Sequence, residues 1–161
     1  MSNLVDDKHE STELLQLVSF KIASEEFGVD ILNVQEINKM STITKVPNSP
    51  EFVEGVINLR GRVIPVVNLR VKMSMPNREY DKDTRIIVVD LSGKTVGFLV
   101  DSVSEVLRIP RNIIEPPPSM VAGINSNYIT AVGKLEDRLL ILLDLDRVLL
   151  EDEKTALETV N

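Results

Sequence analysis

The sequence predicts an all-β protein, mainly strands with short helices, built from two related small β-barrels in tandem. Three observations carry this prediction: apolar residues alternate over short segments, turn residues separate the segments, and one hairpin pattern occurs twice. The first copy runs from Gly55 to Leu69 and consists of two apolar runs around Arg60-Gly61. Moved 76 places, as from 59 to 135, its residues Leu59, Arg62, Val63, Val66, Val67 and Leu69 fall on Leu135, Arg138, Leu139, Leu142, Leu143 and Leu145.

The repeat continues upstream of the hairpin. Val34-Gln-Glu-Ile37 is matched by Val103-Ser-Glu-Val106. A period of about 70 residues is too long for a solenoid unit and favours two barrels, approximately 14–73 and 83–144, with possible exchange of strands between them. The seam between two like units is a candidate binding site.

The elements of the first unit follow from local patterns. Residues 1–13 are polar without periodicity and indicate a disordered lead-in. Strands are expected over 15–22, in the short segment after the turn at 24–28, over 40–46, and in the hairpin 53–69. Asp30 is a candidate N-cap, and Ile31, Val34 and Ile37 recur at helical spacing, so a short helix or helical turn is expected there.

The second unit repeats this arrangement after a polar connection at 72–83. Strands over 84–91 and 95–101 form an antiparallel pair around Ser92-Gly-Lys94, and 128–135 pairs with 138–143. Asp144 can cap a helix that continues into the C-terminal tail, 144–161. Its apolar residues at helical spacing are Leu145, Val148, Leu149, Ala156, Leu157 and Val160.

Composition narrows the functional class. The 161 residues include no cysteine, which excludes disulfides and thiolate ligands, and the net charge is −7. Lysine and arginine are dispersed and aromatic residues are few, which argues against a nucleic-acid partner. No secretory signal begins the chain and no apolar run approaches the roughly 20 residues of a membrane helix, so we expect a soluble cytoplasmic protein.

Catalytic and metal-binding patterns are missing or have simpler explanations. The single histidine, His9, lies in the polar lead-in, which leaves no Ser-His-Asp arrangement. Ser92-Gly-Lys-Thr95 is similar to the end of a phosphate loop, but Val88 replaces the first glycine and the context is a hairpin. Paired aspartates are explained by capping and solvation. We expect no enzyme, no metal and no cofactor.

Surfaces for partners remain. Val34, Glu36 and Ile37 bring apolar and acidic groups together on a short segment, and the two apolar residues either plug the first barrel or contact a partner. Arg60 is either a solvated side chain without a function or a binding residue. The second alternative is supported by the enrichment of arginine at binding hot spots. Both alternatives stay open on these patterns alone.

Several segments closely resemble the CheW family, the coupling proteins of bacterial chemotaxis. They are Phe27-Gly-Val-Asp-Ile-Leu-Asn-Val-Gln-Glu-Ile37, Phe52-Val-Glu-Gly-Val-Ile-Asn-Leu-Arg-Gly61, Pro65-Val-Val-Asn-Leu69, Val96-Gly-Phe-Leu-Val-Asp101, Val103-Ser-Glu-Val106 and Leu140-Ile-Leu-Leu-Asp144. The match covers about 14–150. The resemblance implies two intertwined five-stranded SH3-like barrels without catalysis, and an adaptor role between chemoreceptor (methyl-accepting chemotaxis protein) tips and the histidine kinase CheA.

The resemblance also implies where partners bind. Receptor-binding residues carried over from the family are Val34, Glu36, Ile37, Gly55, Arg60 and Val103, at the groove between the barrels. Kinase contacts carried over to strand edges of one lobe are Ile43 and Val46, facing the kinase's regulatory domain. It implies a cytoplasmic protein recruited to membrane-bound receptor arrays. From the length of the sequence we expect neither the additional domains of CheA nor the receiver domain of a CheV-type protein.

Two other classes compete with this interpretation. One is a generic SH3-like or OB-like module that binds peptide or nucleic acid, and the other is a small-molecule enzyme. Binding of a receptor tip and of the kinase separates the coupling protein from both, and turnover blocked by a groove mutation would favour the enzyme.

Overall fold

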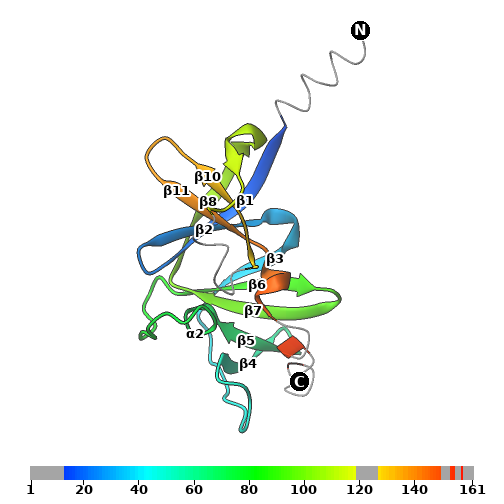
Figure 1. Ribbon diagram of the computed structural model, residues 1–161. Coiled ribbons are helices and arrows are strands. Elements are labelled where there is room, and N and C mark those ends of the chain that lie inside the picture. The colour runs from blue at the N-terminus through cyan, green and yellow to red at the C-terminus, as the bar shows by residue number, and fades with distance from the viewer. Residues whose placement is uncertain (1–12, 119–126, 150–152, 155–156, 158–161) are drawn as a thin grey trace.

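The structure is a computed structural model that describes residues 13–118, 127–149, 153, 154 and 157. Over these residues the chain is mostly β, with two sheets and a few short helices, which confirms the predicted fold class (Figure 1). The predicted lead-in lies, up to residue 12, outside the described residues. The elements in chain order are β1 (Leu14–Ile22), β2 (Glu25–Asp30), the 3₁₀ turn η1 (Ile31–Asn33), β3 (Val34–Lys39), β4 (Val53–Leu59), β5 (Arg62–Asn68), α2 (Leu69–Lys72), β6 (Arg85–Leu91), β7 (Lys94–Val100), β8 (Ser102–Pro110), η2 (Arg111–Ile113), β9 (Ile114–Glu115), β10 (Ile129–Lys134), β11 (Leu139–Leu143) and α4 (Leu145–Val148).

The described strands form a five-stranded sheet in the order β3-β6-β7-β5-β4 and a six-stranded sheet in the order β8-β1-β2-β11-β10-β9. In Figure 1 the six-stranded sheet lies above the five-stranded sheet. The sixth strand, β9, has two residues and is additional to the five that the resemblance implies.

Each sheet takes strands from both halves of the chain. The first half, about 14–73, gives β1 and β2 to the six-stranded sheet and β3, β4 and β5 to the other. The second half gives β6 and β7 to the five-stranded sheet and β8, β9, β10 and β11 to the six-stranded sheet. The polar connection between the halves therefore separates two repeats of sequence, whereas each sheet combines parts of both.

The sequence repeat has a structural counterpart at several points. Strand β5 pairs with β7 in parallel, and β11 pairs with β2 in the same way. Both hairpins carry a register shift at matching places, since Glu54 and Thr130 are each skipped by the ladder. Short helices follow β5 and β11, and each is capped by a side chain, Asn68 in α2 and Asp144 in α4.

The core has three parts. The largest cluster is shared by the two sheets and takes Phe20 and Phe27 from one and Phe98 from the other. A smaller cluster around Ile64 and Val66 belongs to the five-stranded sheet alone, and its counterpart around Leu140 and Leu142 belongs to the six-stranded sheet. Because the shared cluster is the largest, the two sheets form one packed body.

Of two local predictions for the first repeat, one is correct in part and one is wrong. The helical spacing at 31–37 yields only the 3₁₀ turn η1, and Val34 begins a strand that pairs with β6. The pairing of β3 with β6 skips Gln35, between Val34 and Glu36. This extra residue in the strand changes the spacing of its apolar residues from that of a regular strand to one that resembles a helix. The predicted cap is correct, because Asp30 Oδ1 accepts a hydrogen bond from Leu32 N at 2.9 Å.

The segment 40–46 is not a strand. It pairs with β4 at one bridge, Thr44 to Val56, while Met40 and Ile43 pack on the core of the five-stranded sheet. Its apolar residues therefore cover that core without forming a ladder.

The predicted C-terminal helix is interrupted. Helix α4 ends at Val148, and Leu149 is extended with φ −102° and ψ 135°. Glu153, Lys154 and Leu157 are helical again, and Leu157 is buried in the shared core with Leu149. Ala156 and Val160 lie outside the described residues. Among the residues that the structure describes, no helix is long and apolar enough to cross a membrane.

Candidate functional site

The turn between β4 and β5 presents Arg60 to strand β3. Arg60 and Gly61 have positive φ angles of 52° and 85°, as a two-residue hairpin turn requires, and Gly61 N donates to Asn58 Oδ1 at 2.8 Å. The guanidinium then forms two hydrogen bonds with the Glu36 carboxylate, one of them from Nη1 to Oε1 at 3.2 Å. The turn thereby holds a cation against a strand 24 residues earlier in the chain.

This ion pair is open to solvent. The side chain of Arg60 is 72% exposed and that of Glu36 is 25% exposed. The hydrogen bond from Arg60 lowers the pKa of Glu36, and the same contact raises the pKa of Arg60. Both groups therefore keep their charges at neutral pH, and most of the guanidinium is free to meet another molecule.

The three valine and isoleucine candidates are placed differently. Val34 on β3 and Val103 on β8 are partly buried and pack on the shared core, so part of their role is structural. Ile37 is 38% exposed and lies next in the chain to Glu36. Of the two interpretations left open by the sequence, core packing describes Val34 and surface exposure describes Ile37.

Gly55 allows the segment that contains Ile43 and Thr44 to pack closely on β4. It is buried on β4, has a φ of 151°, and a Cβ at this position would lie 2.2 Å from the Thr44 carbonyl oxygen. Ile43 is also close, since its Cγ2 would be 2.8 Å from that Cβ. The structure thus brings Gly55 and Ile43 together. Val46 is half-buried, and its carbonyl accepts a hydrogen bond from Ser49 Oγ at 2.8 Å.

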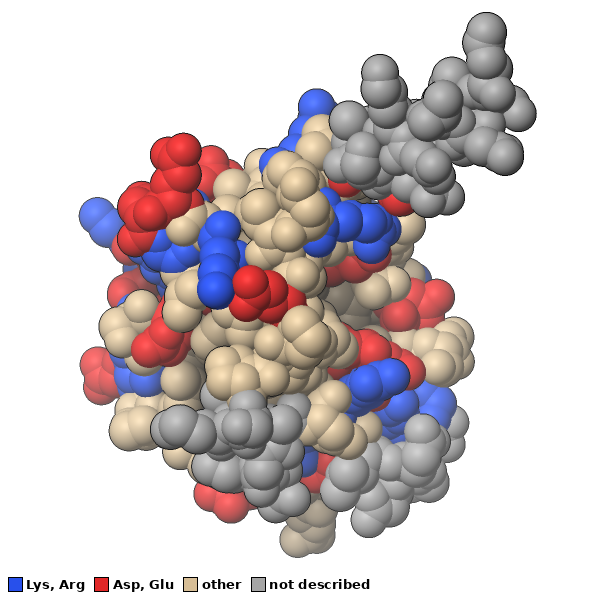
Figure 2. Space-filling view, turned by 45° about the horizontal axis from the view of Figure 1, so that its top comes forward, with Lys and Arg blue, Asp and Glu red and all other residues tan. Residues whose placement is uncertain are grey.

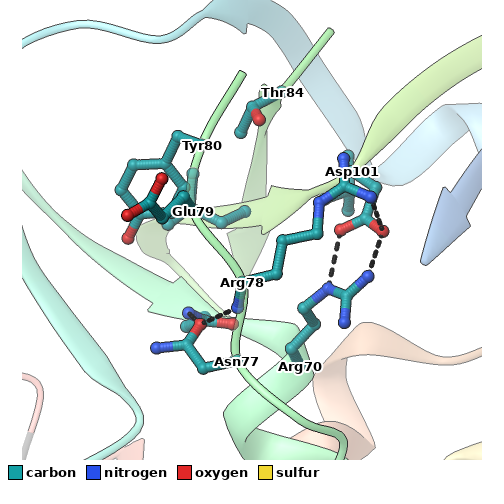
Figure 3. A pocket seen from close by; sticks show the side chains of 10 residues that line it. Arg70, Asn77, Arg78, Glu79, Tyr80, Thr84 and Asp101 are labelled. Atoms are coloured by element: carbon teal, nitrogen blue, oxygen red, sulfur yellow. Dashed lines mark hydrogen bonds and ion pairs between the residues drawn. The ribbon is translucent and has the colours of Figure 1, made fainter. Parts of the chain in front are cut away.

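A partly buried ionic contact between the sheets was missed by the sequence reasoning. Asp101, between β7 and β8, accepts two hydrogen bonds from the guanidinium of Arg70 in α2, one from Nε at 2.9 Å (Figure 3). Its Oδ2 also accepts from Ala23 N in the β1–β2 turn at 2.7 Å. Because the turn belongs to the six-stranded sheet and α2 follows a strand of the other, Asp101 joins the two sheets.

The same carboxylate lines a polar pocket beside the connection 73–84. Arg78 lies 3.6 Å from Asp101 and 2.7 Å from Asp81, and Tyr80 lies across the pocket (Figure 3). Burial is the main cause that raises the pKa of Tyr80, with a further contribution from Glu54. Burial alone would raise the pKa of Asp101, but the contacts with Arg70 and Ala23 outweigh it and lower that pKa.

A buried carboxylate on β2 was also missed. Glu26 on β2 accepts hydrogen bonds from the Ser19 hydroxyl and from Arg138 Nε, the latter at 2.6 Å. These contacts outweigh the effect of burial, so the pKa of Glu26 is lowered. Arg62, the equivalent of Arg138 in the repeat, donates to Thr95 Oγ1 at 2.8 Å. No local signal in the sequence could have found the contact between Glu26 and Arg138, because the two residues lie 112 positions apart in the chain.

The candidate site has the features of a contact surface, without the side chains that would bind a metal ion. Among the described residues, no group of three or more histidine, cysteine or acidic side chains could hold a metal ion. Figure 2 shows charges of both signs interspersed among uncharged residues on the face that it presents. An exposed ion pair with an exposed aliphatic residue next to it in the chain suits a surface that contacts another protein.

Comparison with known proteins gives the family. Residues 16–153 match the family model described as CheW-like domain, so the chain belongs to the CheW-like family. It is 37% identical to the chemotaxis protein CheW of Klebsiella aerogenes, over 90% of this chain and 87% of that protein. It is 40% identical to CheW of Thermotoga maritima, over 84% of this chain and 88% of the relative.

A solved structure agrees with the sequence relatives. The crystal structure of the scaffolding protein TtCheW from Thermoanaerobacter tengcongensis superposes with a TM-score of 0.78 at 41% identity, and covers 84% of this chain and 92% of its own. The chain is accordingly a coupling or scaffold protein of chemotaxis and not an enzyme.

Proposed function

We propose that this protein couples the cytoplasmic tips of chemoreceptors to the histidine kinase CheA. The observation that carries the proposal is the Arg60–Glu36 pair, an exposed cation held on a left-handed turn beside the exposed Ile37. A chemoreceptor tip is a helical hairpin, and a helix is bound through aliphatic anchors with charged groups at their margin. Glu36 and Arg60 supply the charged groups, and Ile37, which points to the other face of the edge strand β3, supplies an aliphatic anchor, while Val34 and Val103 pack on the core.

The kinase contact is assigned to the segment before β4. Ile43 and Val46 are both partly buried and border a segment that makes one backbone bridge with β4. A segment with few backbone partners can pair with another chain, which suits a regulatory domain of the same fold. The two surfaces adjoin where Ile43 lies against Gly55, and moderate affinities suffice because the partners are themselves multivalent. We place this assembly in the cytoplasm, at membrane-bound receptor arrays.

Titration calorimetry tests the proposal with a CheA regulatory domain and a receptor-tip fragment from the same species, each alone and then together. Binding of both at once is the expected result. Binding of neither by the folded protein would reduce the assignment to a two-sheet interaction module with another target. Turnover of a small molecule, blocked by a mutation at the site, would point to an enzyme instead.

The Arg60→Ala variant examines the receptor surface. We expect receptor-tip binding to weaken about tenfold or more, because arginine is a frequent hot-spot residue, while the melting temperature stays close to that of the parent because the pair is exposed. Arg147→Ala is a matched control, since Arg147 is 60% exposed and pairs with Asp144 at 3.4 Å. A large drop in melting temperature for Arg60→Ala would make this residue structural.

The Val46→Asp variant examines the kinase surface. A carboxylate placed in an apolar contact is costly, so we expect weaker binding of the regulatory domain with unchanged binding of the receptor tip. Equal loss of both partners, with the fold retained by circular dichroism, would contradict the separation of the two surfaces.

A further inference from the structure

Asn38 on β3 carries a buried hydrogen-bond donor that has no partner. Its Nδ2 atom is shielded from solvent and, within the described part of the chain, makes no hydrogen bond. Folded proteins contain few such groups, because a buried donor that is left unpaired lowers stability. The position of the Asn38 amide therefore requires a physical explanation.

The register of β3 places Asn38 beside Glu36. The two residues are two positions apart in a strand, so their side chains lie on the same face. On β6 they are opposed by Ile86 and Val88, which are fully buried in the core of the five-stranded sheet. Because these neighbours are apolar, the acceptor that the Asn38 amide approaches is the Glu36 carboxylate.

Arg60 already occupies this carboxylate. It donates one hydrogen bond to each oxygen of Glu36, and this contact is the main cause that lowers the pKa of Glu36. The Asn38 amide lies close enough to lower that pKa further, although its geometry falls short of a hydrogen bond. The terminal torsion of an asparagine side chain is soft, so a rotation of the amide can complete this bond.

Glu36 needs a second donor whenever Arg60 leaves it. The Glu36 side chain is only 25% exposed, and burial opposes the contact with Arg60 by raising the pKa of Glu36. Arg60 is 72% exposed, so a partner reaches the cation of the pair first. Removal of Arg60 would leave a partly buried carboxylate without its main donor, and this penalty opposes binding of the partner.

We propose that Asn38 is a positioning residue of the receptor surface: when a partner takes the Arg60 guanidinium, the Asn38 amide rotates and donates to the Glu36 carboxylate in its place. The exchange keeps Glu36 hydrogen-bonded and gives the buried Nδ2 atom its missing acceptor. Arg60 is then free to bind a carboxylate of the partner. That this partner is a receptor tip rests on the proposed function, whereas the exchange of donors at Glu36 does not.

NMR titration of the Glu36 side-chain carboxyl group tests the exchange without any partner. Arg60→Ala removes the guanidinium, and Asn38 should then pair with Glu36. The pKa of Glu36 in Arg60→Ala should therefore stay below its pKa in the double variant that also carries Asn38→Leu. The side-chain amide protons of Asn38 should move downfield in Arg60→Ala and should titrate together with Glu36. Asn33→Ala alters an exposed asparagine nearby in the chain and should leave the pKa of Glu36 as in the parent.

The same variants separate positioning from packing. Leucine has a similar size and no unpaired donor, so Asn38→Leu should leave the melting temperature unchanged or raise it. Asn38→Ala provides the same comparison without an added apolar side chain. Equal pKa values of Glu36 in Arg60→Ala and in the double variants would overturn the proposal, as would Asn38 amide protons that do not respond to the loss of Arg60.

Calorimetry with the receptor-tip fragment then connects the exchange to binding. Asn38→Leu should weaken binding about threefold to tenfold, the equivalent of one lost hydrogen bond. It should have no effect in the Arg60→Ala background, where no guanidinium has to be released. An equal effect in both backgrounds would make Asn38 a direct contact and contradict the exchange. Absence of tip binding by the parent would count against the proposed function, and the NMR comparison would still decide on the exchange.

Discussion

The contact of Asp101 with Arg70 predicts how firmly the two sheets are joined, and Asp101→Asn is the change that isolates it. The asparagine keeps the shape of the side chain and an oxygen that can accept from Ala23 N. It removes the negative charge that faces the Arg70 guanidinium, where both side chains are 12% exposed. The perturbation therefore acts on the ion pair and leaves the backbone contact in place.

The expected loss of unfolding free energy is about 2 kcal/mol. Removing one partner of a fully buried pair costs about 3–5 kcal/mol, and this pair lies below that range because it is partly solvated and one hydrogen bond remains. Arg70 Nη1 also retains the Pro76 carbonyl at 2.7 Å. For a chain of this length, about 2 kcal/mol corresponds to a fall in melting temperature of roughly 4–8 °C.

The acid dependence supplies a second check on Asp101. Its contacts lower its pKa in the folded state below the value of about 3.9 in unfolded chains, so they stabilise the protein above that pH. The stabilisation is lost as the pH falls through the folded pKa. The difference between parent and Asp101→Asn should therefore shrink from neutral pH towards about pH 3.

Urea unfolding of the parent, Asp101→Asn, Arg70→Gln and the double variant gives the interaction energy as a cycle. A coupling of about 1 kcal/mol or more is expected for side chains in direct contact. A loss below about 0.5 kcal/mol for Asp101→Asn, or additive effects in the cycle, would show that the contact does not join the sheets energetically.

Two further predictions concern stability. Gly55→Ala should cost about 2 kcal/mol or more, because its Cβ would meet the Thr44 carbonyl oxygen and its φ is 151°. Gly61→Ala, which has a φ of 85° but open space around it, should cost about 1 kcal/mol in thermal unfolding, and equal costs would refute the steric argument. Glu26→Gln should destabilise the protein at neutral pH and much less below about pH 4, since the lowered pKa of Glu26 gives stability that acid removes. A loss that is the same at both pH values, measured by urea unfolding, would assign it to packing.

The elements that the sequence predicts well are those whose pattern is local. The hairpin at 53–69 and the pair at 84–101 appear as β4–β5 and β6–β7, because alternation and turn residues are both present in the segment. The strand at 34–39 was predicted as helical because one skipped residue changes the apparent period. Membership of β1 and β2 in a sheet with β11 depends on contacts more than 100 residues apart, which no local pattern encodes.

The residues of the candidate site also fall into those that a local pattern predicts and those that depend on the tertiary fold. Arg60 was predictable from its place in a turn between apolar strands, but its partner Glu36 follows only from the closing of the five-stranded sheet. Asp101 ends the segment Val96–Asp101 that resembles the family, but no pattern pairs it with Arg70, and their contact arises where a helix, a crossover and a turn meet.

The exchange of strands between the repeats determines how this chain can be divided. A fragment ending near residue 73 contains two strands of one sheet and three of the other, and the remaining fragment contains the complementary sets. Neither fragment can complete a sheet or bury Phe20, Phe27 and Phe98 in one cluster. Cleavage in the connection 73–84 would therefore yield two pieces that regain structure only by recombining with each other, as in a split reporter protein.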